Sequence, residues 1–252
     1  MTIADIYVPP RDLASKLRRR WTQARAVRPA RLKFDEPILS VCFDDFPHSA
    51  IEGARVLEEH GGRGTFYASA GLSRIDGPSG PGFEAEDLAR LAEAGHEIGC
   101  HTFAHRDCAR LGAFETLLDL AKNRDALASM GHAGELQSLA YPYGETSNQL
   151  KAALPPRFSC ARGILPGLNM GCVDLAQLHA FPLFGAGFAQ ARQLLKRAAK
   201  RRAWMIVFTH DVADKPSPWG TSPSDLAAFL TAARDLGFSI LPVSKALRRA
   251  RA

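Results

Sequence analysis

The feature that most constrains the fold of this chain is a repeated alternation between short apolar runs and longer segments with helical spacing. Each apolar run is bounded by polar or turn-forming residues, which is typical of a strand buried within a sheet. The runs predict strands over 37–43, 64–70, 96–101, 135–141, 157–163, 203–210 and 238–243. The intervening spacing predicts helices over 50–62, 83–94, 114–130, 146–154, 189–202 and 222–236. Repeated strand–helix units indicate an α/β fold with a mainly parallel sheet, and about seven strands can close into a barrel.

Composition excludes several other classes of protein. The longest strongly apolar run, Ala203 to Thr209, has seven residues, whereas a membrane-spanning helix needs about 20. The first ten residues contain an acid and two prolines where a secretory signal would be apolar. The five cysteines include no CxxC pair, and Cys42, Cys100 and Cys160 lie inside apolar runs, so we expect buried thiols rather than a disulfide framework. These features together predict a cytoplasmic protein.

Positive charge is concentrated near the N-terminus. Residues 11–31 contain eight Arg or Lys and one Asp, so that, with a net charge of +6 for the 252 residues, the rest of the chain is about neutral. Leu13, Leu17 and Trp21 recur at four-residue spacing and so share one face of a helix. The segment is either an arm that contacts an anionic membrane or an acidic partner, or a terminal helix that packs these three side chains on the domain. We therefore divide the chain into a basic arm, residues 1–33, and a main domain, residues 34–252.

Four polar clusters follow four of the predicted strands, each at the point where the strand ends. They are Asp44-Asp45, the HTFAH segment from His101 to His105, the YPYG segment 141–144, and His210-Asp211. Parallel α/β folds build their sites at the carboxyl ends of strands. We therefore expect these loops, although far apart in the sequence, to meet on one rim.

The first two clusters together suit a divalent metal ion. Adjacent carboxylates repel each other unless a cation lies between them; alternatively, one of Asp44 and Asp45 caps the next helix and the other is solvated. His101 and His105, at i and i+4, are expected about one helical turn apart and can share an ion. With a carboxylate from another strand end they form a set that leaves positions open for water and substrate. Zinc suits these ligands, as do other first-row metals.

His210 follows a fully apolar predicted strand at the same rim. Imidazole titrates near neutrality, so His210 is a candidate general acid; the alternative is a buried structural histidine. Asp211 either orients His210 or caps a turn. The remaining histidines are expected at the surface or in satisfied positions, and His48 is of interest because it lies three residues from Asp45.

These clusters, in this order and spacing, resemble the motifs of the polysaccharide deacetylases, the NodB-homology group also called carbohydrate esterase family 4. The resemblance extends from about Leu39 to Val243. It implies a distorted (β/α) barrel of the NodB type and metal-dependent removal of N-acetyl groups from an amino-sugar polymer. It also implies the following roles: Asp44 as general base, Asp45, His101 and His105 as metal ligands, His210 as general acid, and Tyr143, through its backbone N–H, as oxyanion donor.

Three positions depart from the family's pattern. Ala140 stands where the third motif begins with an Arg that orients the catalytic Asp, Phe46 replaces the usual Gly after the Asp pair, and Phe208 is bulkier than the usual apolar residue before the final histidine. Arg162, on the neighbouring predicted strand, is a candidate to supply the missing charge; the alternative is a structural or surface arginine. Asp174 matches the fourth motif poorly.

The resemblance implies an enzyme that releases acetate from the amino-sugar units of an oligo- or polysaccharide. The expected metal is zinc, with cobalt, nickel and manganese as alternatives. An exopolysaccharide of the holdfast type, or its lipid-linked precursor at the inner face of the membrane, fits the expected location and the basic arm. Two alternatives stay open: a metal-dependent amidohydrolase of small N-acyl compounds, and a catalytically weak carbohydrate-binding homologue, which Ala140 favours. No base-reading module is visible, so no nucleic-acid partner is expected.

Overall fold

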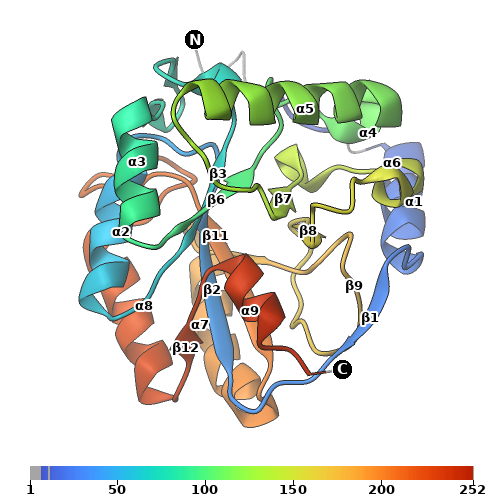
Figure 1. The fold of residues 1–252 in the computed structure, drawn as a ribbon. Coiled ribbons are helices and arrows are strands. Elements are labelled where there is room, and N and C mark those ends of the chain that lie inside the picture. Colours follow the sequence, from blue (N-terminus) through green and yellow to red (C-terminus); the bar gives the residue numbers. More distant parts are fainter. Residues whose placement is uncertain (1–6, 11, 252) are drawn as a thin grey trace.

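A parallel sheet of eight strands runs through the centre of the molecule (Figure 1). The computed structural model describes residues 7–10 and 12–251, so residues 1–6 and Arg11 of the predicted arm lie outside the described residues. Seven strands follow one another in the order β10-β11-β2-β3-β6-β7-β8, and β12 pairs with the first half of β2. The strand bounds are β2 (Ile38–Phe43), β3 (Thr65–Ala68), β6 (Glu97–Cys100), β7 (Ser138–Ala140), β8 (Cys160–Arg162), β10 (Phe181–Pro182), β11 (Trp204–Thr209) and β12 (Ser239–Ile240).

The two outer strands of this order, β8 and β10, are joined by the segment that leads into β10. The N–H of Leu178 donates to the backbone oxygen of Ala161 (2.8 Å), and the N–H of Gly163 donates to that of Leu178 (3.1 Å). These bonds link the two ends of the sheet, in agreement with the distorted (β/α) barrel that the family resemblance implies.

Helices cover the outside of the sheet (Figure 1). Their bounds are α1 (Leu13–Ala24), α2 (Ala50–Glu59), α3 (Ala85–Glu93), α4 (Cys108–Leu111), α5 (Ala113–Ser129), α6 (Asn148–Ala153), α7 (Gly185–Arg201), α8 (Pro223–Asp235) and α9 (Val243–Arg248), with short 3₁₀ turns at η2 (Ala70–Leu72) and η3 (Pro142–Gly144). None of the described helices is both long enough and apolar enough to cross a lipid bilayer.

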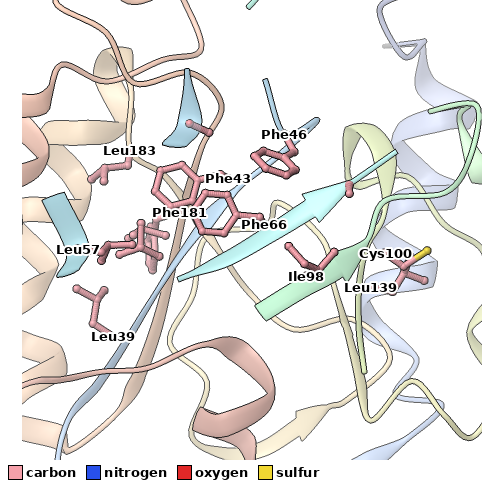
Figure 2. Packing of buried hydrophobic residues seen from close by; sticks show 14 of the residues in the cluster. Leu39, Phe43, Phe46, Leu57, Phe66, Ile98, Cys100, Leu139, Phe181 and Leu183 are labelled. Atoms are coloured by element: carbon pink, nitrogen blue, oxygen red, sulfur yellow. The ribbon is translucent and has the colours of Figure 1, made fainter. Parts of the chain in front are cut away.

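Burial on both faces explains the continuous apolar runs of the central strands. Every residue of β2 and of β11 is buried. Leu39 and Phe43 of β2 pack in the large cluster between sheet and helices, whereas Ile38 and Cys42 belong to a second cluster on the opposite face. Phe43 stacks on Phe66 with 4.5 Å between ring centroids (Figure 2). Apolar residues are therefore needed at successive positions instead of at every second one.

Two parts of the chain differ from the sequence prediction. Residues 164–188, which carry no clear pattern, contain β9 (Gly171–Asp174), which pairs antiparallel with β1 (Pro29–Leu32), as well as β10. The predicted strand 238–243 ends at Ile240, and α9 follows it. Both differences involve strands of two to four residues, which are too short to produce a visible periodicity. The remaining strand pair, β4 (Asp76–Gly77) and β5 (Gly80–Pro81), forms a hairpin within the predicted loop 74–82.

The N-terminal helix α1 turns its apolar side chains away from the domain. Leu13, Leu17 and Trp21 are 77%, 65% and 64% exposed, so the expectation that they pack on the domain is wrong. The buried residues of α1 are Ser15 and Thr22, on the other side of the helix. The helix therefore docks through its polar face.

Candidate metal centre and active site

The carboxyl ends of four strands bring the predicted site residues together on one rim. In chain order, β2 is followed by Asp44 and Asp45, β6 by His101, β7 by η3 with Tyr143, and β11 by His210. The backbone N–H of Asp44 donates to Thr209 O (2.8 Å), which fixes the end of β2 against the end of β11.

Asp45, His101 and His105 converge on one point. Nε2 of His105 lies 2.9 Å, and Nε2 of His101 3.3 Å, from Oδ1 of Asp45. One ligand atom from each residue lies within 4.8 Å of the other two. Among the residues that the structure describes, no second group of three His, Cys, Asp or Glu side chains has such an arrangement.

The hydrogen-bonding state of this cluster fits a metal ion. Nδ1 of His101 lies 2.7 Å from the backbone oxygen of Ala140, so Nδ1 carries the hydrogen and Nε2 presents a lone pair to Asp45. Oδ1 of Asp45 is buried and has no hydrogen-bond partner in the described part of the chain. Lone pairs that face each other repel, whereas a divalent cation between them can bind all three ligands. Imidazole and carboxylate donors suit zinc and other first-row metals.

Asp45 is kept ionised by its surroundings. Burial raises the pKa of Asp45, but the imidazoles of His105 and His101, in their protonated form, lower it more strongly by their charge and hydrogen bonds, so the pKa of this carboxyl lies well below its usual value. Asp45 is consequently ionised at neutral pH, as a candidate carboxylate ligand must be.

His101 and His105 lie on a loop between β6 and α4, and the expectation of a helical turn between them is wrong. Thr102 (φ 64°) and His105 (φ 49°) have left-handed backbone, which interrupts any helix. The carboxylate of Asp119, on α5, accepts hydrogen bonds from the N–H groups of residues 103 (2.6 Å) and 104 (3.2 Å). Asp119 thus holds the loop between the two histidines, a role that no local sequence pattern indicates.

Left-handed backbone is concentrated at the site. The described residues include seven non-glycine residues with positive φ, and five belong to the site or its neighbours: Asp45, Phe46, Thr102, His105 and Tyr143. Each such conformation costs about 1–2 kcal/mol in an ordinary residue, and such strain clusters at functional sites. At the end of β2 it makes the chain leave the strand, so that the neighbours Asp44 and Asp45 need not point to opposite faces.

Phe46 keeps this conformation because its ring is anchored. The ring is fully buried, stacks on Phe83 with 4.8 Å between centroids and contacts Phe66 edge-on at 5.3 Å. Figure 2 shows Phe46 beside Phe66 in the apolar cluster. Apolar packing therefore offsets the strain at a position where the family pattern has Gly.

Asp44 is paired with a buried arginine. The guanidinium of Arg162 donates to Oδ1 of Asp44, and both side chains are almost fully buried. The guanidinium carbon lies 4.7 Å from the ring centre of Tyr67 and 5.1 Å from that of Phe208. Burial lowers the pKa of Arg162, but the carboxylate of Asp44 raises it more, so the net shift is upward. In the register of β7 and β8, Arg162 is the direct neighbour of Ala140.

His210 is oriented by a backbone carbonyl. Its Nδ1 lies 3.2 Å from Trp219 O, and its Nε2 lies 4.0 Å from Oδ2 of Asp45. Asp211 accepts instead from the N–H (2.7 Å) and hydroxyl of Ser217, so it orders the loop that carries Trp219. Of the two roles considered for Asp211, the structure shows the turn-capping one.

Tyr143 borders the group formed by Asp45, His101 and His105. Its ring centre lies 4.8 Å from that of His105 and 4.9 Å from that of Tyr7. Burial, followed by the charge of Asp45, raises the pKa of Tyr143 to about 12, so the phenol is neutral at ordinary pH. Tyr7 donates to Oδ2 of Asp107 (2.6 Å). Tyr7 is a site neighbour that the sequence does not predict, because nothing in its local sequence indicates a contact about 140 residues away.

Two residues considered from the sequence lie outside the cluster. His48 pairs through Nδ1 with Asp87 (2.8 Å). Asp174 accepts hydrogen bonds from the N–H groups of 27 and 28 and pairs with the buried Lys151 (2.9 Å). Both contacts hold structural elements together, and neither involves a residue of the cluster.

The chain resembles known proteins in sequence and in fold. Residues 31–155, about half of the chain, match the family model described as polysaccharide deacetylase. No curated protein sequence matches the chain. The chain belongs to the polysaccharide deacetylase family.

Three solved structures illustrate the shared fold. The peptidoglycan deacetylase PdaC from Bacillus subtilis is 15% identical, with a TM-score of 0.55 over 85% of this chain and 92% of that chain. A family 4 acetyl xylan esterase from Clostridium thermocellum, in complex with cobalt, is 16% identical, with a TM-score of 0.58 over 84% and 90%. A CE4 family pseudoenzyme from Bacillus anthracis is 13% identical, with a TM-score of 0.56 over 87% and 68%. At these identities the likeness concerns the fold.

Proposed function

We propose that this protein is a metal-dependent deacetylase that hydrolyses N-acetyl groups on the amino-sugar units of an oligo- or polysaccharide. The observation that carries the proposal is the convergence of Asp45, His101 and His105, with His210 beside Asp45 and the Arg162–Asp44 pair on the same rim. Asp45, His101 and His105 would hold the ion. When bound, a divalent ion polarises an amide oxygen and lowers the pKa of water.

The other site residues move protons. Asp44, in its ionised form, accepts a proton from the water that attacks the acetyl carbon. Arg162 pairs with the Asp44 carboxylate and fixes its direction through a buried ion pair. His210 donates the hydrogen on Nε2 to the departing amine nitrogen, since its Nδ1 is engaged by Trp219 O. The C–N bond breaks, and the products are acetate and a free amino sugar.

The charge that develops on the acetyl oxygen needs a donor. The family resemblance assigns this task to the backbone N–H of Tyr143, and the left-handed conformation of Tyr143 (φ 58°) sets the direction of its peptide groups. A preorganised donor of this kind contributes about 3–4 kcal/mol to stabilising the transition state.

The proposal extends to the metal and the polymer. Zinc is the expected ion, with cobalt, nickel or manganese as alternatives, because two imidazoles and one carboxylate suit all four. The expected substrate is an exopolysaccharide, or its lipid-linked precursor at the cytoplasmic face of the membrane. The ion pair of Arg162 with Asp44 supports activity over a non-catalytic carbohydrate-binding role, since it places a guanidinium beside the base despite Ala140.

The test combines metal analysis with acetate release from N-acetylglucosamine oligomers. We expect Asp44→Ala and His210→Ala to lower turnover by a factor of about 10² to 10⁴ while retaining bound metal, because they supply proton transfer. His101→Ala should lose both metal and turnover. His48→Ala is the matched control, since His48 pairs with Asp87 away from the cluster, and it should retain both.

Three outcomes would contradict the proposal. Turnover that survives exhaustive chelation excludes a metal-dependent reaction. Release of acetate from small N-acyl compounds but not from sugar oligomers identifies the amidohydrolase. Metal and oligosaccharide binding with no acetate release identifies a carbohydrate-binding homologue.

A further inference from the structure

The helix α1 presents an apolar stripe away from the domain. Leu13, Leu17 and Trp21 are more than half exposed and, at four-residue spacing, lie along one side of the helix. Val8, in the segment before α1, is also 61% exposed. A row of exposed large apolar side chains on a short segment of a folded protein marks an interaction surface.

The polar face of the same helix is fixed to the domain. Ser15 and Thr22 are buried, and Arg18 and Arg19 both pair with Glu145, which is 6% exposed. Since the inward face is held by buried polar groups, the helix cannot turn its apolar stripe inward without losing these contacts.

A buried lysine fastens the C-terminal end of α1. Nζ of Lys151 donates to Thr22 O (2.6 Å), Arg25 O (2.7 Å) and Gln177 Oε1 (3.2 Å) and pairs with Asp174. A cation at the C-terminal carbonyls of a helix is electrostatically favourable. The orientation of α1, with its stripe outward, is therefore part of the folded structure.

Positive charge accompanies the stripe. Lys16, Arg20 and Arg25 are exposed and make no salt bridge with any residue that the structure describes. Apolar and aromatic side chains flanked by free cations are the pattern of a helix that lies in the headgroup region of an anionic bilayer. Two copies of α1 would instead bring like charges together, which opposes dimerisation through this face.

We propose that α1 is a membrane-surface helix, with Leu13, Leu17 and Trp21 inserted into a bilayer that contains anionic lipid and with Lys16 and Arg20 beside the lipid headgroups. The arm also contacts the site, because the ring of Tyr7 packs on Tyr143 and Glu145 lies two residues further along the same loop. Membrane contact would thus hold this loop close to the bilayer. Such a position suits a substrate saccharide that is carried on a membrane lipid, a point that rests on the proposed function.

The test is flotation of the full chain with vesicles of phosphatidylcholine, with and without phosphatidylglycerol. We expect binding to the anionic vesicles, decreasing with salt. Leu13→Ser/Leu17→Ser/Trp21→Ser and Lys16→Glu/Arg20→Glu should each lower the bound fraction at least about tenfold, because both the apolar and the charged contributions are lost. Acetate release from a soluble oligomer should be unchanged in both variants, which separates this proposal from that of the catalytic site.

Matched controls come from other exposed helices. Phe114→Ser/Leu118→Ser removes two exposed apolar residues at the same spacing on α5, and Arg192→Glu/Lys196→Glu reverses two exposed charges at the same spacing on α7. Both should bind vesicles like the wild type. Absence of binding to anionic vesicles, equal losses in the controls, or a dimer in light scattering that the triple variant abolishes would overturn the proposal.

Discussion

Arg162 and Asp44 show that one charge can be supplied from either of two adjacent strands. Ala140 and Arg162 are paired residues of β7 and β8, so an arginine at either position starts from almost the same place on the sheet. Tyr67 and Phe208 cover the guanidinium and exclude water from the ion pair. The position of the positive charge relative to Asp44 matters more than the strand that carries it, because Coulombic attraction depends on distance.

Moving the arginine from position 162 to position 140 tests whether its charge acts on Asp44 from either strand. Arg162→Ala leaves Asp44 buried without its partner, which should destabilise the fold by about 3–5 kcal/mol and lower kcat much more than it changes KM. The double variant Ala140→Arg/Arg162→Ala should recover part of both stability and kcat. Thermal unfolding and steady-state kinetics check this. Recovery of stability without any recovery of kcat would mean that Arg162 is structural only.

The loop between β6 and α4 obtains its shape from α5, which lies next to it in space. Asp119 binds two N–H groups of the loop, and Asn123, one turn later, accepts from Ala70 N–H (2.8 Å) and donates to Ala68 O (2.9 Å). One face of α5 therefore holds the backbone around both β3 and β6. The helix α5, which covers the sheet, thus also positions a candidate metal ligand, His105.

Asp119→Ala tests this positioning. Without the carboxylate the loop is free to move, so His105 should occupy its place beside Asp45 less often. We expect the dissociation constant for Zn²⁺ to rise about tenfold or more, as is usual when groups that orient a ligand are removed. Asp125→Ala, at an exposed position of the same helix, is the control and should bind Zn²⁺ like the wild type. Equal affinities for the two variants would show that Asp119 has no such role.

The stability of the folded chain should depend on pH through His96. Its Nδ1 accepts from Gly64 N–H (2.9 Å) and its Nε2 donates to Glu58 (3.1 Å), so the neutral imidazole joins α2, β3 and β6. Burial lowers the pKa of His96 from its ordinary 6.5, and Glu58 offsets this only in part. As the pH falls below 6.5, the unfolded chain takes up the proton before the folded chain does. The contribution of His96 is therefore complete above this pH and declines during acidification.

His96→Asn measures this contribution. The amide oxygen can still accept from Gly64 but does not titrate, so the free energy of unfolding should change less between pH 7 and pH 5.5 in the variant, as measured with urea at several pH values. At neutral pH the variant should be less stable by about 1–2 kcal/mol, because the bond to Glu58 is lost. Parallel pH profiles for the two proteins would show that His96 does not contribute.

The sequence by itself determined the strand–helix order and which residues end the strands, because burial imposes a local pattern of apolar residues and parallel sheets place functional groups at their carboxyl ends. Asp44, Asp45, His101, His105, Tyr143 and His210 follow from that reasoning and from the family's motifs. Only the tertiary structure decided that Arg162 reaches Asp44, that Asp119 holds the histidine loop, that Tyr7 packs on Tyr143, and that α1 turns its apolar side outward. These contacts join residues far apart in the chain, and periodicity reports whether a residue is buried but not which distant residue it meets.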